Sequence, residues 1–121
     1  MQNPFLRSAT PKFANHSVLV NLAKKTAEQI AANHPEVNRI ILFGSVARKD
    51  FSARSDLDLL IVLESSHLPI SERIAGFLEE CSGYPTDVFP LTEAELESRL
   101  RDGDPFWVRA LREGIECYKR D

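Results

Sequence analysis

Two aspartates stand at the head of a strongly apolar run. Asp56 and Asp58 are two residues apart, and apart from Asp58 every residue from Leu57 to Leu63 is apolar. Such a run predicts a strand buried on both faces, and side chains two apart on a strand share a face. Two like charges there cost on the order of several kcal/mol unless something neutralises them. The stretch therefore predicts a site that holds divalent cations against a phosphate group.

A glycine–serine pair, Gly44-Ser45, follows the preceding apolar strand, which we expect over residues 38–43. Glycine adopts backbone conformations closed to other residues and lets a ligand approach closely. Ser45 is a suitable N-cap for a short helix over residues 46–49, whose free N–H groups would face an anion. Arg48 would add positive charge nearby. Taken alone, the pair is more typical of an ordinary turn, so its interpretation depends on the aspartates ten residues later.

The turn, the ten-residue spacer and the aspartate pair together resemble the signature of the DNA polymerase β-like nucleotidyltransferase superfamily. In that family the turn binds a nucleoside triphosphate, and the aspartates bind two Mg²⁺ ions with a third carboxylate from a neighbouring strand. Asp87, in a predicted strand over residues 86–89, stands at the expected place of that third carboxylate. The implied catalytic and metal-binding residues are Asp56, Asp58 and Asp87. The predicted nucleotide-binding residues are Gly44, Ser45 and Arg48.

Within the superfamily the chain is most similar to the minimal nucleotidyltransferases (MNT), which are often encoded beside a helical HEPN-type protein as toxin–antitoxin pairs. The resemblance implies transfer of a nucleoside monophosphate, AMP from ATP, onto a hydroxyl of a partner protein such as a HEPN toxin. It does not identify ATP over other nucleoside triphosphates. Because no helical domain follows the catalytic core in this sequence, we expect a partner chain or a second copy of this chain to complete the site.

Two other functions stay open. A non-catalytic module could bind nucleotide and act as an antitoxin by occluding a partner protein. Two departures from the family pattern favour it: Val46 replaces a frequent arginine, and Lys49-Asp50 replaces a frequent glycine. Modification of a small molecule, as in aminoglycoside nucleotidyltransferases, is less favoured because no substrate-binding domain follows the core.

Length and composition favour one domain over residues 16–121, preceded by a flexible arm over residues 1–15. The net charge of −3 gives no signal for nucleic-acid binding. The two cysteines lack metal-ligand spacing, and no apolar run is long enough to span a membrane, so a cytoplasmic protein is expected.

The remaining pattern predicts an α+β fold: a small mixed sheet with helices mainly on one face and the metal site on the more open face. Apolar periodicity places a helix over residues 17–33 and another from Pro69 to residue 81. Thr92 with Glu95 forms a capping box, and Asp104-Pro105 opens a further helix. A last strand is expected over residues 115–118.

Overall fold

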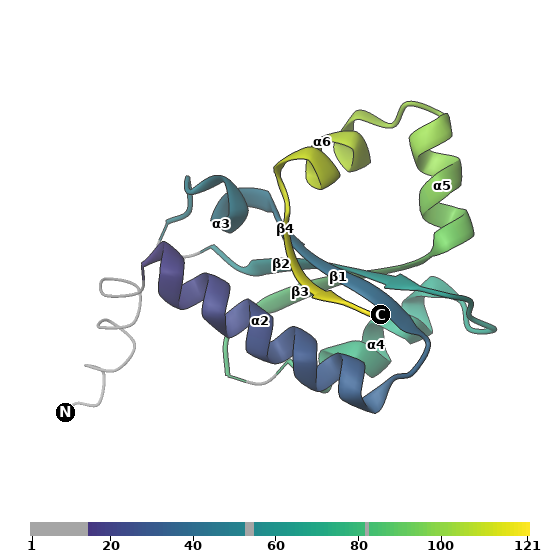
Figure 1. Cartoon of the computed structure of the whole chain (residues 1–121), viewed down its shortest axis with the longest axis horizontal. Helices are drawn as coiled ribbons and strands as arrows, with labels where there is room; N and C mark the ends of the chain where they lie inside the picture. The colour runs from purple at the N-terminus through teal and green to yellow at the C-terminus, as the bar shows by residue number, and fades with distance from the viewer. Residues whose placement is uncertain (1–14, 53–54, 82) are drawn as a thin grey trace.

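The computed structural model describes residues 15–52, 55–81 and 83–121. Its helices and strands are arranged around one sheet (Figure 1). In chain order they are α2 (His16–Asn33), β1 (Val37–Phe43), α3 (Gly44–Arg48), β2 (Leu57–Leu63), α4 (Ile70–Leu78), β3 (Thr86–Thr92), α5 (Glu93–Arg101), α6 (Pro105–Glu113) and β4 (Ile115–Lys119).

The four strands form a mixed sheet in the order β3-β2-β1-β4. β1 runs antiparallel to both of its neighbours, whereas β2 and β3 are parallel and are joined by α4. This confirms the predicted α+β fold with a small mixed sheet. The register places Phe43 opposite Asp58 and Asp58 beside Asp87, so the ends of three strands meet at one place.

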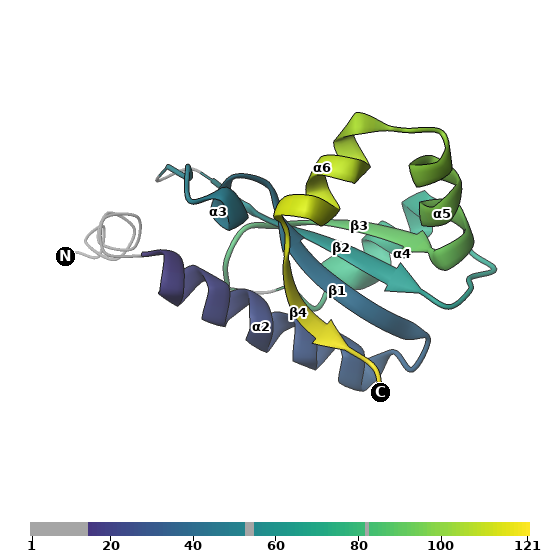
Figure 2. The same ribbon diagram turned by 45° about the horizontal axis from the view of Figure 1, so that its top comes forward.

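Helices α2 and α4 cover one face of the sheet (Figure 2). The buried stripe of α2 is Leu19, Ala23, Ala27 and Ile30, which recur at helical spacing. They pack on alternate residues of the two central strands, among them Ile40, Leu42, Leu59 and Ile61. Asn15 begins the helix as its N-cap, accepting a hydrogen bond from the Val18 N–H at 3.0 Å. The rest of the expected N-terminal arm lies outside the described residues.

Helices α5 and α6 lie over the other face, so that face is covered in part (Figures 1 and 2). Trp107 and Ala110 of α6 and Leu96 of α5 pack against the remaining alternate residues of β1 and β2, such as Ile41 and Leu60. The capping box predicted at the start of α5 is present, with Thr92 and Glu95 bonding reciprocally. Asp104 caps α6 and Pro105 is its first residue, as the sequence predicts.

Two boundaries differ by three residues from those expected. α4 ends at Leu78, so Cys81 lies beyond the helix and only half-buried against the core. β3 continues through Pro90 to Thr92 instead of ending at Phe89. A proline is compatible with β3 because this strand is at the edge of the sheet, where an N–H is not needed for pairing.

Arg73 links the two faces around the edge formed by β3. It lies on α4 and is 7% exposed. Its guanidinium donates to the carbonyls of Leu68 (2.8 Å) and Pro90 (3.1 Å) and makes two bonds to the Glu95 carboxylate (2.7 and 3.1 Å). This arginine holds the pKa of Glu95 at about 2, although partial burial works against that shift.

None of the described helices is both long and apolar enough to cross a membrane.

Candidate functional site

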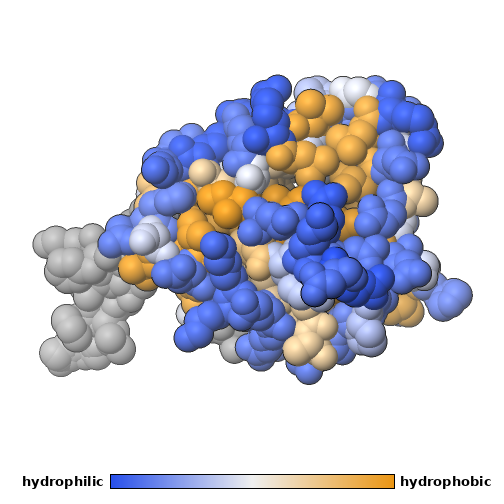
Figure 3. All heavy atoms as spheres, viewed as in Figure 1, coloured by the Kyte–Doolittle hydropathy of each residue, from blue (hydrophilic) through white to orange (hydrophobic). Residues whose placement is uncertain are grey.

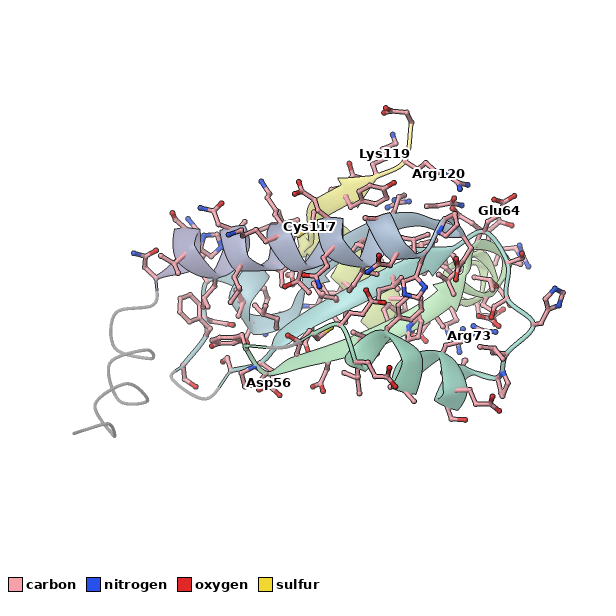
Figure 4. The ribbon with its side chains drawn as sticks, turned by 90° about the horizontal axis from the view of Figure 1, so that it is seen from below. Asp56, Glu64, Arg73, Cys117, Lys119 and Arg120 are labelled. Atoms are coloured by element: carbon pink, nitrogen blue, oxygen red, sulfur yellow. The ribbon has the colours of Figure 1, made fainter. Side chains whose placement is uncertain are left out.

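The three predicted carboxylates lie together at one end of the central strands. Asp58 projects from β2 on the face that carries α5 and α6, because Leu57 and Leu59 on either side of it face the core beneath α2. The parallel register sets Asp87 of β3 beside it. Asp56 immediately precedes β2, and Figure 4 shows it at the opposite end of the sheet from Glu64.

The charges of the other two carboxylates act on Asp58. Its pKa is raised to about 6, mainly by burial and then by the charges of Asp87 and Asp56, while Arg48 opposes the shift. The structure therefore brings Asp56 and Asp87 within electrostatic range of Asp58. Their negative charge is only partly balanced by the protein's own cations.

Two hydrogen bonds to backbone carbonyls fix the position of the chain where Asp56 precedes β2. The Tyr84 hydroxyl donates to the carbonyl of Ser55 at 3.1 Å, and the Leu57 N–H donates to the carbonyl of Pro85 at 3.0 Å. These bonds tie the segment on either side of Asp56 to the start of β3. The aspartate therefore has a fixed backbone position next to Asp58.

Gly44 lies directly against the Asp58 carboxylate. Its φ is +79°, a conformation that strains any other residue type. A Cβ atom built on it would lie 2.3 Å from Asp58 Oδ2 and 3.2 Å from Asp58 Cγ. A glycine is required here for both reasons, and its backbone passes close to the carboxylate that the metal would bind.

Ser45 is not the N-cap that the sequence suggests. α3 already begins at Gly44, because the chain turns as soon as β1 ends at Phe43, and no side chain caps the helix. Ser45 still lies in the first turn of α3 and lines the same pocket as Gly44 and Asp58. Lys49 ends α3 with a φ of +68°, the left-handed conformation in which a glycine is favoured.

A pocket of about 380 Å³ opens beside these residues, a volume in the range of small-molecule sites. Gly44, Ser45, Arg48 and Asp58 line it, so all three predicted nucleotide-binding residues lie at the same pocket as one of the predicted catalytic acids. Asp56 and Asp87 adjoin Asp58 but are not part of the pocket lining.

Helix α6 supplies pocket residues that the sequence did not identify: Phe106, Arg109, Ala110 and Glu113. Arg109 and Glu113 are four residues apart, a spacing that predicts a helical ion pair, and Arg109 Nε donates to Glu113 Oε1 at 3.0 Å. That spacing could have been noticed in the sequence. Only the packing of α6 against α3 and β1 shows that the pair faces the site.

An aromatic cluster forms the other side of the pocket. Phe43, Phe89, Phe106 and Trp107 contact one another, with the rings of Phe106 and Trp107 edge to face at 4.7 Å between centroids. Trp107 is a buried core residue, whereas Phe106 is 52% exposed. Figure 3 shows apolar side chains reaching the surface over α5 and α6. The pocket thus joins a charged half to an apolar, aromatic half.

The donor set fits Mg²⁺ only if a ligand supplies further oxygens. In the described part of the chain, no three acidic, histidine or cysteine side chains are placed to hold a metal ion by themselves. Mg²⁺ is commonly bound by one or two carboxylates together with substrate phosphates and water. Asp58, with Asp56 and Asp87 nearby, matches that chemistry, and a metal ion would offset the mutual repulsion expressed in the raised pKa of Asp58.

Comparison with known proteins agrees with this arrangement. No curated protein sequence matches the chain. The fold is similar to that of a candidate nucleotidyltransferase from Sulfolobus solfataricus, with a TM-score of 0.64 and 24% identity over 87% of this chain and 84% of that one. It is also similar to a chain in the crystal structure of a toxin–antitoxin with AMP-PNP, with a TM-score of 0.51 and 15% identity over 81% of this chain and 74% of that one.

The sequence itself matches a family over most of its length. Residues 25–121 match the profile of the polymerase beta nucleotidyltransferase family. This range contains the glycine–serine turn, the aspartate pair and the third carboxylate that meet in the structure. The chain therefore belongs to the polymerase beta nucleotidyltransferase family.

Proposed function

We propose that this protein is a Mg²⁺-dependent nucleotidyltransferase that moves a nucleoside monophosphate, AMP from ATP, onto a hydroxyl of a partner protein such as a HEPN-type toxin. One observation carries the proposal. The carboxylate of Asp58 lies against the backbone of Gly44, at the wall of a pocket of suitable size, and the charges of Asp87 and Asp56 both act on it. A purely structural strand end has no need of a partly buried carboxylate whose ionised form is further destabilised by two other acids.

Each predicted residue has a role in this proposal. Asp56, Asp58 and Asp87 would hold two Mg²⁺ ions, which when bound neutralise phosphate charge and lower the pKa of the acceptor hydroxyl. The open backbone at Gly44 admits a phosphate close to Asp58, and Ser45 and Arg48 offer donors to it. The acceptor oxygen bonds to the α-phosphorus as pyrophosphate leaves, so the protein contributes mainly positioning and charge.

The acceptor group would enter from the open side of the pocket. Phe106 is half exposed there, beside the charged half, and gives an acceptor side chain an apolar surface to lie against. The fold similarity to a toxin–antitoxin crystallised with AMP-PNP supports a protein partner and an adenine nucleotide. A second copy of this chain is the alternative source of the acceptor.

The test is a transfer reaction with captured partners. Wild type, Asp58→Asn and Asp102→Asn are used to capture proteins from the native host, and intact masses are measured before and after adding ATP and Mg²⁺. Asp102 is exposed at the end of α5, so its variant is the matched control. We expect wild type and Asp102→Asn to add nucleotide mass to a partner and Asp58→Asn to add none. Equal transfer by all three proteins would refute the assignment of Asp58.

A nucleotide-binding antitoxin without transfer activity is the second candidate. Val46 favours it, because this residue is fully buried and takes the place at which many relatives have an arginine. Lys49 also holds a left-handed conformation where a glycine is frequent. A ligand that binds only the folded state raises thermal stability. Stabilisation by ATP and Mg²⁺ without any mass change on a bound partner would therefore support this candidate over the transferase.

A further inference from the structure

Two arginines from different elements converge on one carboxylate at the pocket. Arg109 of α6 donates from Nε to Glu113 Oε1 at 3.0 Å. Arg48 of α3 brings its Nη1 to 4.0 Å from the same oxygen, and its Nε donates to Asp50 at 3.2 Å. All but Asp50 line the pocket that contains Gly44 and Asp58. The side of the pocket formed by α3 and α6 is therefore lined by two guanidinium groups and one carboxylate, and Glu113 shares its charge between the two guanidinium groups.

The positions of these groups are fixed by the packing of α6. Gly114 follows Glu113 directly, and a Cβ atom built on it would lie 2.5 Å from Ile41 Cγ2 and 2.7 Å from the carbonyl oxygen of Ala110. The end of α6 is therefore pressed against β1 with no space for a larger residue. Buried Ala110 and Trp107 hold the same helix on the sheet. Arg109 and Glu113 consequently project from a rigid element.

The ion pairs themselves are easily exchanged. Arg109 is 57% exposed and Glu113 30% exposed, and pairs four residues apart on a helix surface add little stability. A guanidinium group has a planar fork of donors that matches phosphate oxygens in pairs, and phosphate chains carry more charge than one carboxylate. A triphosphate entering the pocket would offer both arginines a better partner than Glu113.

We propose that Arg109 binds the triphosphate together with Arg48, and that Glu113 holds both guanidinium groups until the nucleotide replaces its carboxylate. This inference rests on the proposed function and adds a binding residue from α6 to it. It divides the pocket into two walls. On one wall Asp58, with Asp87 beside it, would face the metal-bound part of the phosphate chain, and on the other the arginines of α3 and α6 would face its free oxygens.

Calorimetric titration with two probes tests the proposal: AMP-PNP with Mg²⁺, and inorganic tripolyphosphate with Mg²⁺, which contains no base. The proteins are wild type, Arg109→Gln, Glu113→Gln and the control Arg112→Gln. Arg112 is an exposed arginine of the same helix that does not line the pocket. We expect Arg109→Gln to weaken the binding of both probes about tenfold or more, the usual effect of losing a charge-assisted hydrogen bond.

The other two variants should not weaken the binding of the probes. Arg112→Gln should bind both probes as wild type does. Glu113→Gln should bind them more tightly, because a negative charge that competes for the arginines is gone. Thermal unfolding of Arg109→Gln without ligand should match that of Arg112→Gln, which excludes a merely structural loss.

Two outcomes would overturn the inference, and they are distinguishable. If Arg109→Gln binds both probes like the control while Asp58→Asn has lost transfer activity, Arg109 is not a phosphate-binding residue and the proposed function stands. If wild type binds neither probe in the presence of Mg²⁺, both the inference and the proposed transferase are wrong. Weaker binding by Glu113→Gln would contradict the exchange between carboxylate and phosphate.

Discussion

Replacing Gly44 by alanine tests how closely the turn after β1 packs against Asp58 of β2. Two costs are expected. Alanine at a φ of +79° is strained by about 1–2 kcal/mol. Its Cβ would also lie 2.3 Å from Asp58 Oδ2, so the carboxylate must rotate out of its position at a cost of about 1 kcal/mol. Gly44→Ala should therefore lower the free energy of unfolding by about 2–3 kcal/mol.

The two costs are separable with a second substitution. In an Asp58→Ala background the carboxylate is absent, and the nearest remaining atom, the Cβ of residue 58, is 3.5 Å away, an ordinary contact. Gly44→Ala should then cost only the strain of its backbone. The difference between the two backgrounds, about 1 kcal/mol, is the coupling energy of the contact.

Urea unfolding of the four proteins, analysed by linear extrapolation, measures this coupling. Measurements are made without Mg²⁺ so that lost metal binding does not enter the result. An equal cost of Gly44→Ala in both backgrounds would refute the close contact between the turn and Asp58. Since the rotated carboxylate no longer points where the metal would bind, Gly44→Ala should also lose Mg²⁺-dependent nucleotide binding.

Three further predictions concern single residues. The pKa of Asp58 is raised to about 6 from 3.8, so its ionisation opposes folding above that pH. Asp58→Asn should therefore be more stable than wild type at pH 8, and this difference should disappear as the pH falls through 6 towards 4. Thermal unfolding of both proteins across this pH range measures it. Lys49→Gly should raise the free energy of unfolding by up to about 1 kcal/mol in urea, because glycine adopts a φ of +68° without strain; a loss of stability would contradict this. Arg73→Gln should lower it by about 2 kcal/mol, because Glu95 and two backbone carbonyls lose a charged donor, whereas the exposed control Arg101→Gln should change it little.

The part of the site that could be predicted depends only on residues close together in the sequence. Side chains two residues apart on a strand lie on the same face, so the positions of Asp56 and Asp58 in the apolar run predict a shared face without knowledge of the topology. The parallel register that brings Asp87 beside Asp58 follows from the helical connection through α4, and the family resemblance supplied it in advance. Gly44 was identified because its residue type is limited by backbone conformation.

The part that could not be predicted depends on contacts between distant segments. Arg109 and Glu113 read as an ordinary ion pair on an exposed helix face, and nothing local places α6 over the end of β1. The same holds for Arg73, which in sequence is one polar residue of an amphipathic helix and in the structure is buried against Pro90. Extension of β3 beyond Phe89 was missed because a proline usually ends a strand, except at a sheet edge.

Pro90 and Arg73 also determine how this protein can meet another chain. An exposed sheet edge invites a foreign strand to pair with its free N–H and carbonyl groups. At the middle of β3, Pro90 has no N–H to donate and its carbonyl is already bonded to Arg73. A partner, or a second copy, cannot add a strand across that point without displacing a buried arginine. Recognition across that point of the edge must therefore use side chains, which can change between related proteins while the sheet stays unchanged.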